Sequence, residues 1–344
     1  MTTLSEVARH AGVTPATVSN VLRNRGKVGA ATRERVLASV AALGYRPNLT
    51  ARALAEGRAP TLALMVSSIA NPFYPEFALE AERAARKRGH FLLVCNTDND
   101  SNVGSAYLDR IAGTLSQGVL VMNADLHFED LIKTQRHGAS VVLCMWEKPD
   151  QPPGLSCIAV DFRQAGRIAA QHLLDLGHRR IGAIVGCEPG GVQAMRYVGL
   201  VDALADIDAA LPATLERETR YVEDNVEGGY AAAMALLDAS PDLTAIFVSN
   251  DFPALGVLHA AADRGLRVPE DLSVIGITDI HWARLARPAL TTVAVPTAQA
   301  AEMAVELVLD LIHNPRKEPT TRIADEPQLV VRQSTAPVPT RSKA

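Results

Sequence analysis

From Thr61 onward, short apolar runs alternate with helical stretches, and this alternation limits how the chain can fold. The runs are typical of buried strands: LALMV (62–66), FLLVC (91–95), VLVM (119–122), VVLCM (141–145), IGAIVG (181–186), AIFVS (245–249) and LSVIGI (272–277). Each of the first six is followed by a helical stretch, as in Pro75 to Arg88, Arg163 to Leu176 and Pro253 to Arg264. Repeated strand-helix units form parallel sheets with right-handed crossovers, so this part is predicted to be α/β.

The length of the α/β part favours two doubly wound parallel sheets over one. It holds about 280 of the 344 residues, which is more than one ordinary domain needs. The segment QPPG at 151–154 interrupts the pattern, so we place the seam between the two sheets near Asp150 to Leu155.

The first stretch of the chain, Thr3 to Asn24, predicts two helices joined by a tight turn. Thr3 and Glu6 form a capping-box pattern, and Gly12 can adopt the left-handed conformation that ends the first helix. Thr14 is a natural N-cap with Pro15 at the first helical position. The second helix then presents a small, neutral, hydrogen-bonding face that suits base edges and phosphates: Thr14, Ala16, Thr17, Ser19, Asn20 and Asn24. A short helix pair of this kind is equally often a piece of an ordinary core.

Two further helical segments follow this pair. A third helix over Ala31 to Leu43 can close an all-α core, and Gly44 ends it. Next, Asn48 can cap a helix of about two turns that Gly57 terminates. So short a helix is marginal alone, and we expect DNA or a second copy of the chain to order it. The expected divisions are a head at 1–46 and a linker at 47–60.

The charge distribution separates the head from the body. Residues 1–60 hold nine bases and three acids, a net charge of +6, and because the whole chain carries −4, the remainder carries −10. A basic head on an acidic body is the pattern expected when only one end meets a polyanion. The sequence shows neither an apolar run long enough to span a membrane nor a secretion signal, which favours a cytoplasmic protein. The cysteines are widely spaced and predicted to be buried thiols, without metal or cofactor: Cys95, Cys144, Cys157 and Cys187.

The order of these segments resembles the lactose-repressor (LacI) family of bacterial transcription regulators, and the resemblance covers essentially the whole chain. The most specific segments are TLSEVARHAGVTPATVSNVLRN, TRERVLASVAALGYRPNLTARALAEG, SSIANPFYPEF, LGHRRIGAIVG, MRYVGL, SNDFPALGV, LRVPEDLSVIGI and PALTTVAVP. The resemblance implies an N-terminal helix-turn-helix head and a two-lobed, periplasmic-binding-protein-like body at 61–335. It implies a first lobe of about 61–155 and 291–320 and a second lobe of about 156–290 and 321–335. The tail at 336–344 contains Pro, Ser and Lys and is predicted from this composition to be disordered.

By this resemblance, the helix from Thr14 to Leu22 lies in the major groove of operator DNA. Pro15, Ala16 and Asn20 then occupy the positions that choose bases. Ala16 offers only a methyl group, which could contact thymine but is equally explained by helix propensity, whereas Asn20 can read adenine in bidentate fashion. The family positions that hold phosphates and register carry Thr14, Thr17 and Ser19.

The resemblance also assigns roles to the short helix of the linker. Leu54 occupies the wedge position that, paired with its copy in a homodimer, enters the minor groove and kinks the DNA. Ala51 and Ala55 would permit a close approach to the groove, and Arg52 can bind phosphate. A leucine in a short helix is ordinarily a core residue, but the flanking Pro47 and Gly57 favour the wedge.

The effector is expected in the cleft between the lobes, where strand ends and helix starts converge. The residues that match the family there are Phe73, Tyr74, Asp161, Arg196, Asn250 and Asp251. Arg196 would grip a ligand carboxylate or hydroxyls, with a surface salt bridge as the alternative. Two positions depart from the family pattern, because Thr278 stands where many members have an aspartate and Asp224 where an aromatic residue is frequent. Gly190 and Val192 lack the polar groups that would favour a purine, so a sugar remains the family default, and Asp224 opposite Arg196 would suit a polyol, a sugar acid or an amino-bearing ligand.

The sequence therefore predicts a homodimeric, DNA-binding transcriptional regulator, most simply a repressor, that is controlled by a small molecule. Activation, or repression that needs a corepressor, is open for the same fold. A solute-binding receptor is a further alternative, against which the basic head and the missing signal peptide argue. An enzyme is not expected, because no nucleophile elbow, metal-binding HExxH motif or phosphate-binding loop is present.

Overall fold

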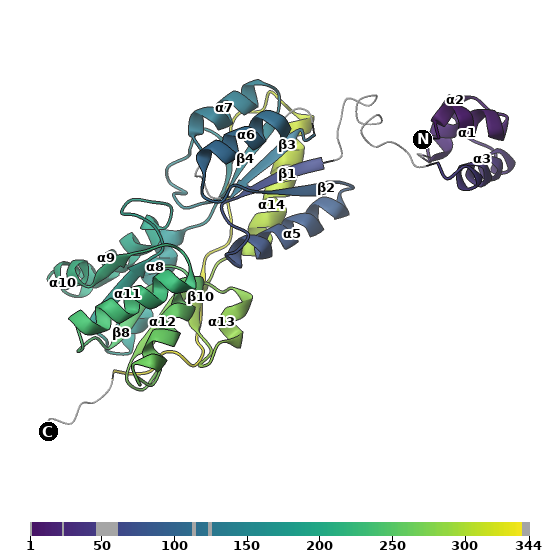
Figure 1. Ribbon diagram of the computed structural model, residues 1–344. Helices are drawn as coiled ribbons and strands as arrows, with labels where there is room; N and C mark the ends of the chain where they lie inside the picture. Colours follow the sequence, from purple (N-terminus) through teal and green to yellow (C-terminus); the bar gives the residue numbers. More distant parts are fainter. Residues whose placement is uncertain (1, 23, 46–60, 112–114, 123–125, 339–344) are drawn as a thin grey trace. The chain divides into compact units, whose positions relative to one another are not determined.

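The computed structural model describes residues 2–22, 24–45, 61–111, 115–122 and 126–338 (Figure 1). The chain divides into two compact units, Met1–Ala59 and Pro60–Ala344. The linker positions Ala51, Arg52, Leu54 and Ala55 lie outside the described residues.

The first unit is a three-helix head. Its helices are α1 (Leu4–Ala11), α2 (Pro15–Leu22) and α3 (Ala30–Ala42), packed around Val7, Ala8, Val18, Val21 and Val36. The predicted capping box is confirmed, because the Thr3 N–H donates to Glu6 Oε2 at 2.7 Å and the Glu6 N–H donates to Thr3 Oγ1 at 3.3 Å. Gly12 has a φ of 63° and ends α1 as expected. The head is therefore the predicted all-α unit.

The second unit contains two six-stranded sheets, which confirms the expected two-lobed α/β body. The first sheet has the order β11-β5-β4-β3-β1-β2, and its registered pairs are parallel. Its strands are β1 (Thr61–Val66), β2 (Phe91–Asn96), β3 (Gly118–Met122), β4 (Ser140–Trp146), β5 (Ser156–Ala159) and β11 (Thr321–Ile323). Its helices are α5 (Phe73–Lys87), α6 (Ser101–Ile111), α7 (Phe128–Arg136) and α14 (Thr297–His313).

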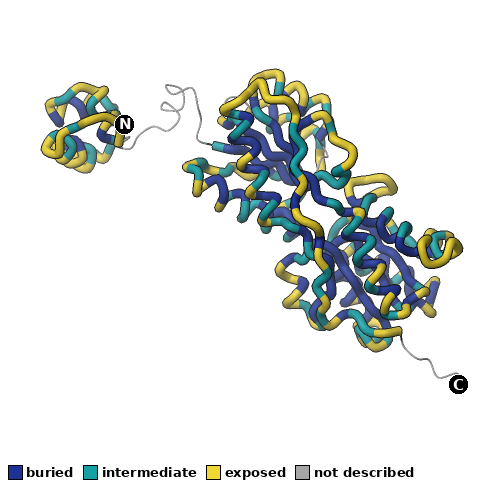
Figure 2. Tube along the Cα trace, turned by 180° about the vertical axis from the view of Figure 1, so that it is seen from behind, coloured by how far each residue is buried: buried dark blue, intermediate teal, exposed yellow. Residues whose placement is uncertain are grey.

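Alternate residues of the first sheet enter different apolar clusters, as a sheet covered on both faces requires. Leu62, Leu64 and Leu120 join the cluster that contains buried side chains of α5 and α14, whereas Met65 and Val121 join the cluster with α6 and α7. In Figure 2 the buried residues run along the strands, and the exposed residues lie on the outer sides of the helices.

The second sheet has the order β12-β10-β9-β8-β6-β7. Its strands are β6 (Ile181–Val185), β7 (Thr219–Tyr221), β8 (Ala245–Val248), β9 (Ser273–Thr278), β10 (Thr291–Ala294) and β12 (Gln328–Val330), of which β10 and β12 are antiparallel. Its helices are α8 (Phe162–Asp175), α9 (Ala194–Ile207), α10 (Leu211–Arg217), α11 (Val226–Ala239), α12 (Asp251–Asp263) and α13 (His281–Leu285).

The chain passes between the lobes after β5, after β10 and after β11, and this order corrects the lobe limits expected from the sequence. Residues 156–159 and 321–323 belong to the first sheet, whereas residues 291–294 belong to the second. The helical stretch expected after 141–145 is not formed, because β4 is followed directly by β5, and the segment QPPG is a connection within the first lobe and not the seam between the lobes.

The expected tail also begins later than predicted. The Ala336 N–H donates to Ser273 Oγ at 3.1 Å, and the Val338 N–H donates to the carbonyl of Leu176 at 2.9 Å. Residues 336–338 are therefore part of the second lobe, and 339–344 lie outside the described residues. All four cysteines are free, and three of them are buried. Within the described ranges no helix is both long and apolar enough to cross a membrane.

Candidate functional site

The outer face of α2 carries the residues expected to meet DNA. Pro15, Ala16 and Asn20 are exposed, whereas Val18 and Val21 are buried against the other head helices. The Asn20 side-chain amide makes no hydrogen bond to any described residue of the head, so both its donor and its acceptor are open to a base edge.

The neighbouring polar residues of the head have local roles as well. Thr14 caps α2, because its Oγ1 accepts the Thr17 N–H at 3.2 Å and lies 2.9 Å from Thr17 Oγ1. Ser19 is partly buried, and Asn24, with a φ of 51°, lies in the exposed turn after α2. Thr14, Thr17 and Ser19, which are predicted to hold phosphates, thus lie in or next to the same helix as Pro15, Ala16 and Asn20, and Asn24 follows that helix.

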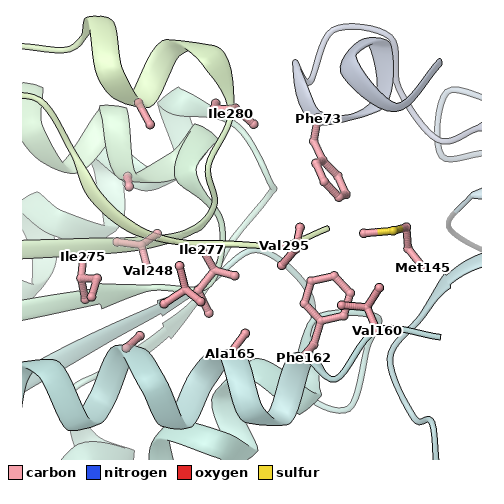
Figure 3. Close-up of a cluster of buried hydrophobic side chains, with 14 of the residues drawn as sticks. Phe73, Met145, Val160, Phe162, Ala165, Val248, Ile275, Ile277, Ile280 and Val295 are labelled. Atoms are coloured by element: carbon pink, nitrogen blue, oxygen red, sulfur yellow. The ribbon is translucent and has the colours of Figure 1, made fainter. Parts of the chain in front are cut away.

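A cavity of about 290 Å³ lies between the lobes of the second unit. Apolar side chains form much of its wall, including Phe73, Met145 and Phe162, which Figure 3 shows converging from three different elements. Its charged and amide-bearing side chains are Glu147, Lys148, Gln193, Arg196, Asp224 and Asn250. Apolar walls with a few convergent polar groups are typical of a small-molecule site.

Arg196 is the buried cation of the cavity, and three of its five side-chain N–H groups are hydrogen-bonded. It is 4% exposed, and its guanidinium lies 4.1 Å from the ring centroid of Phe162. Nη1 donates to the carbonyl of Ser249 at 2.8 Å, while Nε and Nη2 donate to Glu147 Oε1 at 3.2 and 3.0 Å. The alternative of a surface salt bridge is wrong, because this ion pair is buried and connects the two lobes.

Glu147 follows β4 at the carboxyl end of the strand and reaches Arg196 from the first lobe. One carboxylate oxygen, Oε1, accepts both bonds from Arg196, and the buried Oε2 has no hydrogen-bond partner among the described residues. Burial raises the pKa of Glu147 to about 7, although the charge of Arg196 opposes this rise.

Asp224 forms the second connection between the lobes. Its Oδ2 accepts from Asn71 Nδ2 of the first lobe at 2.8 Å and from Asn250 Nδ2 of the second at 3.0 Å. Its Oδ1 is buried without a hydrogen-bond partner in the described part of the chain. Burial raises the pKa of Asp224 to about 6, again against the charge of Arg196.

A close helix crossing fixes the backbone of Arg196. Gly166 of α8 lies under α9, and a Cβ atom at this position would lie 2.0 Å from the carbonyl oxygen of Arg196. Gly199 has the reciprocal relation to α8, since its Cβ would lie 2.0 Å from the carbonyl oxygen of Arg163. The two glycines let the helices approach closely, which sets the position from which Arg196 enters the cavity.

The residues predicted for the effector site fall into two groups. The residues that line the cavity are Phe73, Tyr74, Arg196, Asp224 and Asn250. The residues that do not line it are Asp161, Asp251 and Thr278.

Asp161, Asp251 and Thr278 lie behind or beside the cavity. Asp161 caps α8 by accepting the Gln164 N–H at 2.8 Å. Asp251 is fully buried and accepts from Thr292 Oγ1 at 2.6 Å and from the Ile280 N–H at 3.0 Å. Thr278 donates to Asn250 Oδ1 at 3.3 Å and thereby supports a lining residue. Its φ of 121° is a strained value for a β-branched residue.

Three residues of the site are not among those predicted from the sequence: Glu147, Gln193 and Asn71. Glu147 could have been predicted, because a charged residue directly after a buried strand lies at the edge of a parallel sheet where ligands bind. Asn71 lies within SSIANPFYPEF without a periodicity that would single it out, and Gln193 immediately precedes α9.

The two buried carboxylates predict that the stability of the ligand-free body falls between about pH 4.5 and 7. In this range the unfolded chain has released the protons of Glu147 and Asp224 while the folded chain, with pKa values of about 7 and about 6, still binds them. Fewer protons are then bound in the unfolded state, so the free energy of unfolding decreases as the pH rises. Urea denaturation at pH 5, 6 and 7 measures the slope, and a Glu147→Gln/Asp224→Asn variant is expected to reduce it, leaving the part contributed by Asp251, whose pKa burial also raises to about 7. An unchanged slope in that variant would contradict the assignment.

A helix-turn-helix head joined to a two-lobed body with a cavity between the lobes defines a ligand-binding, DNA-binding regulator as the class of protein. Residues 3–48 match the model of the lacI family of bacterial regulatory proteins, and residues 170–335 match that of the periplasmic binding protein-like domain. The chain is 33% identical over 345 residues to the HTH-type transcriptional regulator DegA of Bacillus subtilis, covering 98% of this chain and 99% of that protein.

Two further comparisons extend over the whole chain. The HTH-type transcriptional repressor PurR of Mannheimia succiniciproducens is 31% identical over 337 residues, covering 97% of this chain and 98% of the relative. The solved structure of the transcriptional regulator CelR with cellobiose is 31% identical, with a TM-score of 0.69 over 97% of this chain and 100% of that one. The chain belongs to the LacI family of bacterial transcription regulators.

Proposed function

We propose that this chain is a sequence-specific transcriptional repressor whose operator affinity is controlled by a small sugar-like effector between the lobes. The observation that carries the proposal is the cavity whose polar side chains come from both lobes, in a chain that belongs to a family of DNA-binding regulators. Activation and corepressor-dependent repression would use the same head and cavity, and experiments distinguish them from effector-relieved repression. Such a protein is expected to work beside its operator in the cytoplasm and to catalyse no reaction.

The size of the cavity suits one sugar ring. Its volume of about 290 Å³ lies at the lower end of the range of roughly 300–1,000 Å³ that is typical of small-molecule sites, which suits a ligand the size of a monosaccharide. The relative CelR is solved with cellobiose, a sugar, which supports a sugar-like effector for this chain as well. The similarity to PurR does not indicate a purine effector for this chain, because Gly190, Gly191 and Val192 line the cavity and offer no polar side-chain groups to a purine.

The contacts between the lobes supply a mechanism for control. Arg196 to Glu147 and Asn71 to Asp224 connect the lobes at the cavity, and the His281 N–H donates to Glu76 Oε1 at 2.8 Å elsewhere between them. A ligand that competes with or adds to these contacts binds one arrangement of the lobes more tightly than another. The ligand can change operator affinity only by as much as its own affinities for the two arrangements differ.

We further propose that the chain acts as a homodimer on a near-palindromic operator. Apolar side chains left exposed on the body suit a partner copy, among them Phe91 of β2, which is 62% exposed, and Trp282 of α13, which is 56% exposed. In such a dimer Leu54 remains the proposed minor-groove wedge, with Ala51 and Ala55 at the groove and Arg52 on phosphate.

Gel-shift titration against the DNA upstream of the chain's own gene tests the proposal. We expect binding that weakens as salt increases and that changes when an effector is added. Transcription from the same promoter in vitro then separates repression from activation. Absence of salt-sensitive binding to that DNA and to a selected operator library would refute the regulator function.

Replacing Asn20 by alanine tests the base-reading face. We expect discrimination between cognate and random DNA to fall by about 1–3 kcal/mol, because the variant loses the only exposed bidentate side chain proposed for α2. Competition gel shifts with both DNAs measure the ratio. Ser19→Ala is the matched control and should weaken both complexes to a similar degree. A wild-type ratio for the Asn20 variant would exclude it from base reading.

A further inference from the structure

The carboxylates of the cavity are not evenly paired with cations. Glu147 forms an ion pair with the buried guanidinium of Arg196, whereas Asp224 forms no ion pair with any described residue. Lys148 is the other cation that lines the cavity; its residue is partly exposed, as are Glu147 and Asp224, and its charge lowers the pKa of Glu147. Cys187, near this group of charges, is held neutral because burial raises its thiol pKa. Asp224 therefore lacks a directly bonded cation.

Two acceptor oxygens of the cavity are buried and unpaired. Glu147 Oε2 and Asp224 Oδ1 have no partner within hydrogen-bond distance in the described part of the chain, and buried acceptors left unpaired are costly. The Met195 N–H and the Gln193 side chain lie near enough to lower the pKa values of Glu147 and Asp224, respectively, but do not complete these bonds. Three of the five N–H groups of Arg196 bond Glu147 Oε1 and the Ser249 carbonyl, and neither of the other two bonds Glu147 Oε2 or Asp224 Oδ1. A ligand carboxylate that binds Nε and Nη2 of Arg196 in bidentate fashion would have to displace Glu147.

We propose that the effector is an aminated monosaccharide whose protonated amine binds the carboxylates of Asp224 and Glu147. This inference rests on the proposed sugar-like effector and specifies its chemistry. An ammonium group brings three donors, no acceptor and a positive charge, which suits two unpaired carboxylate oxygens of which only one belongs to an existing ion pair. The ring of a monosaccharide fits the volume of about 290 Å³ and can lie against the apolar walls at Phe73 and Met145. Neutral sugars can satisfy the acceptors but bring no cation to Asp224.

Matched sugars test the proposal directly. Isothermal titration of the full chain would compare glucosamine, galactosamine and mannosamine with their N-acetyl forms, their neutral parent hexoses and the corresponding uronic acids. We expect at least one amine to bind about tenfold or more tightly than its N-acetyl and parent forms, as a charge-assisted bond allows. Uronic acids are expected not to bind. The proposal is overturned if no amine shows this preference, or if a uronic acid binds best.

Charge-removing variants locate the effect. Asp224→Asn and Glu147→Gln keep the side-chain volume, and each is expected to reduce the preference for the amine while retaining binding of the scaffold. Glu218→Gln is the matched control, because Glu218 is a buried carboxylate of the second lobe, to which Asp224 also belongs, and it accepts from Ser240 Oγ at 2.6 Å without lining the cavity. An equal loss of preference in the control would assign the effect to the overall charge of the lobe.

The dependence on pH gives an independent measurement. Amine affinity is expected to rise from pH 5 to 7 as Asp224 and Glu147 ionise beside Arg196, Lys148 and the neutral Cys187. This rise should be smaller in Asp224→Asn. Gel shifts with the operator distinguish the proposed regulator function from the proposed amine effector. If operator binding responds to neutral sugars but not to amines, the regulator function stands and only the amine is refuted.

Discussion

Replacement of Arg196 by methionine is expected to lower the free energy of unfolding of the body by about 3–5 kcal/mol, the cost of leaving buried charges without their partner. Methionine keeps an unbranched chain that can still pack on Phe162. It leaves the carboxylates of Glu147 and Asp224 without a nearby buried cation, and the Ser249 carbonyl without its donor. Urea denaturation of the full chain measures the loss, and effector titration should show that binding is lost as well.

The matched control for this variant is Arg163→Met. Arg163 pairs with Asp202 at 2.6 Å, but its side chain is 52% exposed. An exposed pair of this kind contributes below about 1 kcal/mol. If the Arg196 variant is no less stable than the Arg163 variant, the buried group of charges is not important for the fold. A double-mutant cycle with Glu147→Gln would then measure how much of the loss belongs to that pair.

Gly166→Val is expected to destabilise the body by about 1–3 kcal/mol or more, because an inserted side chain overpacks a tight helix crossing. Its Cβ would lie 2.0 Å from the carbonyl oxygen of Arg196, so α8 and α9 must separate before the fold can form. That separation moves Arg196 away from Glu147 and Ser249. We therefore expect effector affinity to fall more than tenfold, measured by titration under conditions where the variant is folded.

A second helix crossing supplies the control. A Cβ at Gly229 of α11 would lie 2.0 Å from the carbonyl oxygen of Pro253 in α12, which is the same overlap at a site that does not line the cavity. Gly229→Val should therefore destabilise the body to a similar degree while changing effector affinity much less. Equal losses of affinity in both variants would show that general instability, and not the position of Arg196, controls binding.

The sequence predicted those parts of the fold in which local pattern and tertiary burial agree. Long apolar runs such as 62–66 and 141–145 became central strands, and the capping residues of α1 and α2 acted as expected. The strands that escaped prediction are short, such as β5 and β7. Their three or four residues are too few to show a period, and pairing with neighbouring strands determines their conformation.

The candidate site was predictable where the family resemblance supplied positions, and incomplete where it depended on contacts between the lobes. Phe73, Tyr74 and Arg196 line the cavity as expected. The pairing of Glu147 with Arg196 joins residues 49 positions apart, and that of Asn71 with Asp224 joins residues 153 apart. No local pattern encodes such pairs, because they depend on how the two sheets are connected.

The three passages of the chain between the lobes have a consequence for how the protein is made. The first sheet is complete only when β11 has been synthesised, and the second only when β12 follows at Gln328–Val330. Neither lobe is therefore a contiguous fragment, and both must finish folding after nearly the whole chain has left the ribosome. The head is contiguous and can fold much earlier. During synthesis, a DNA-binding unit thus exists before the part that would regulate it.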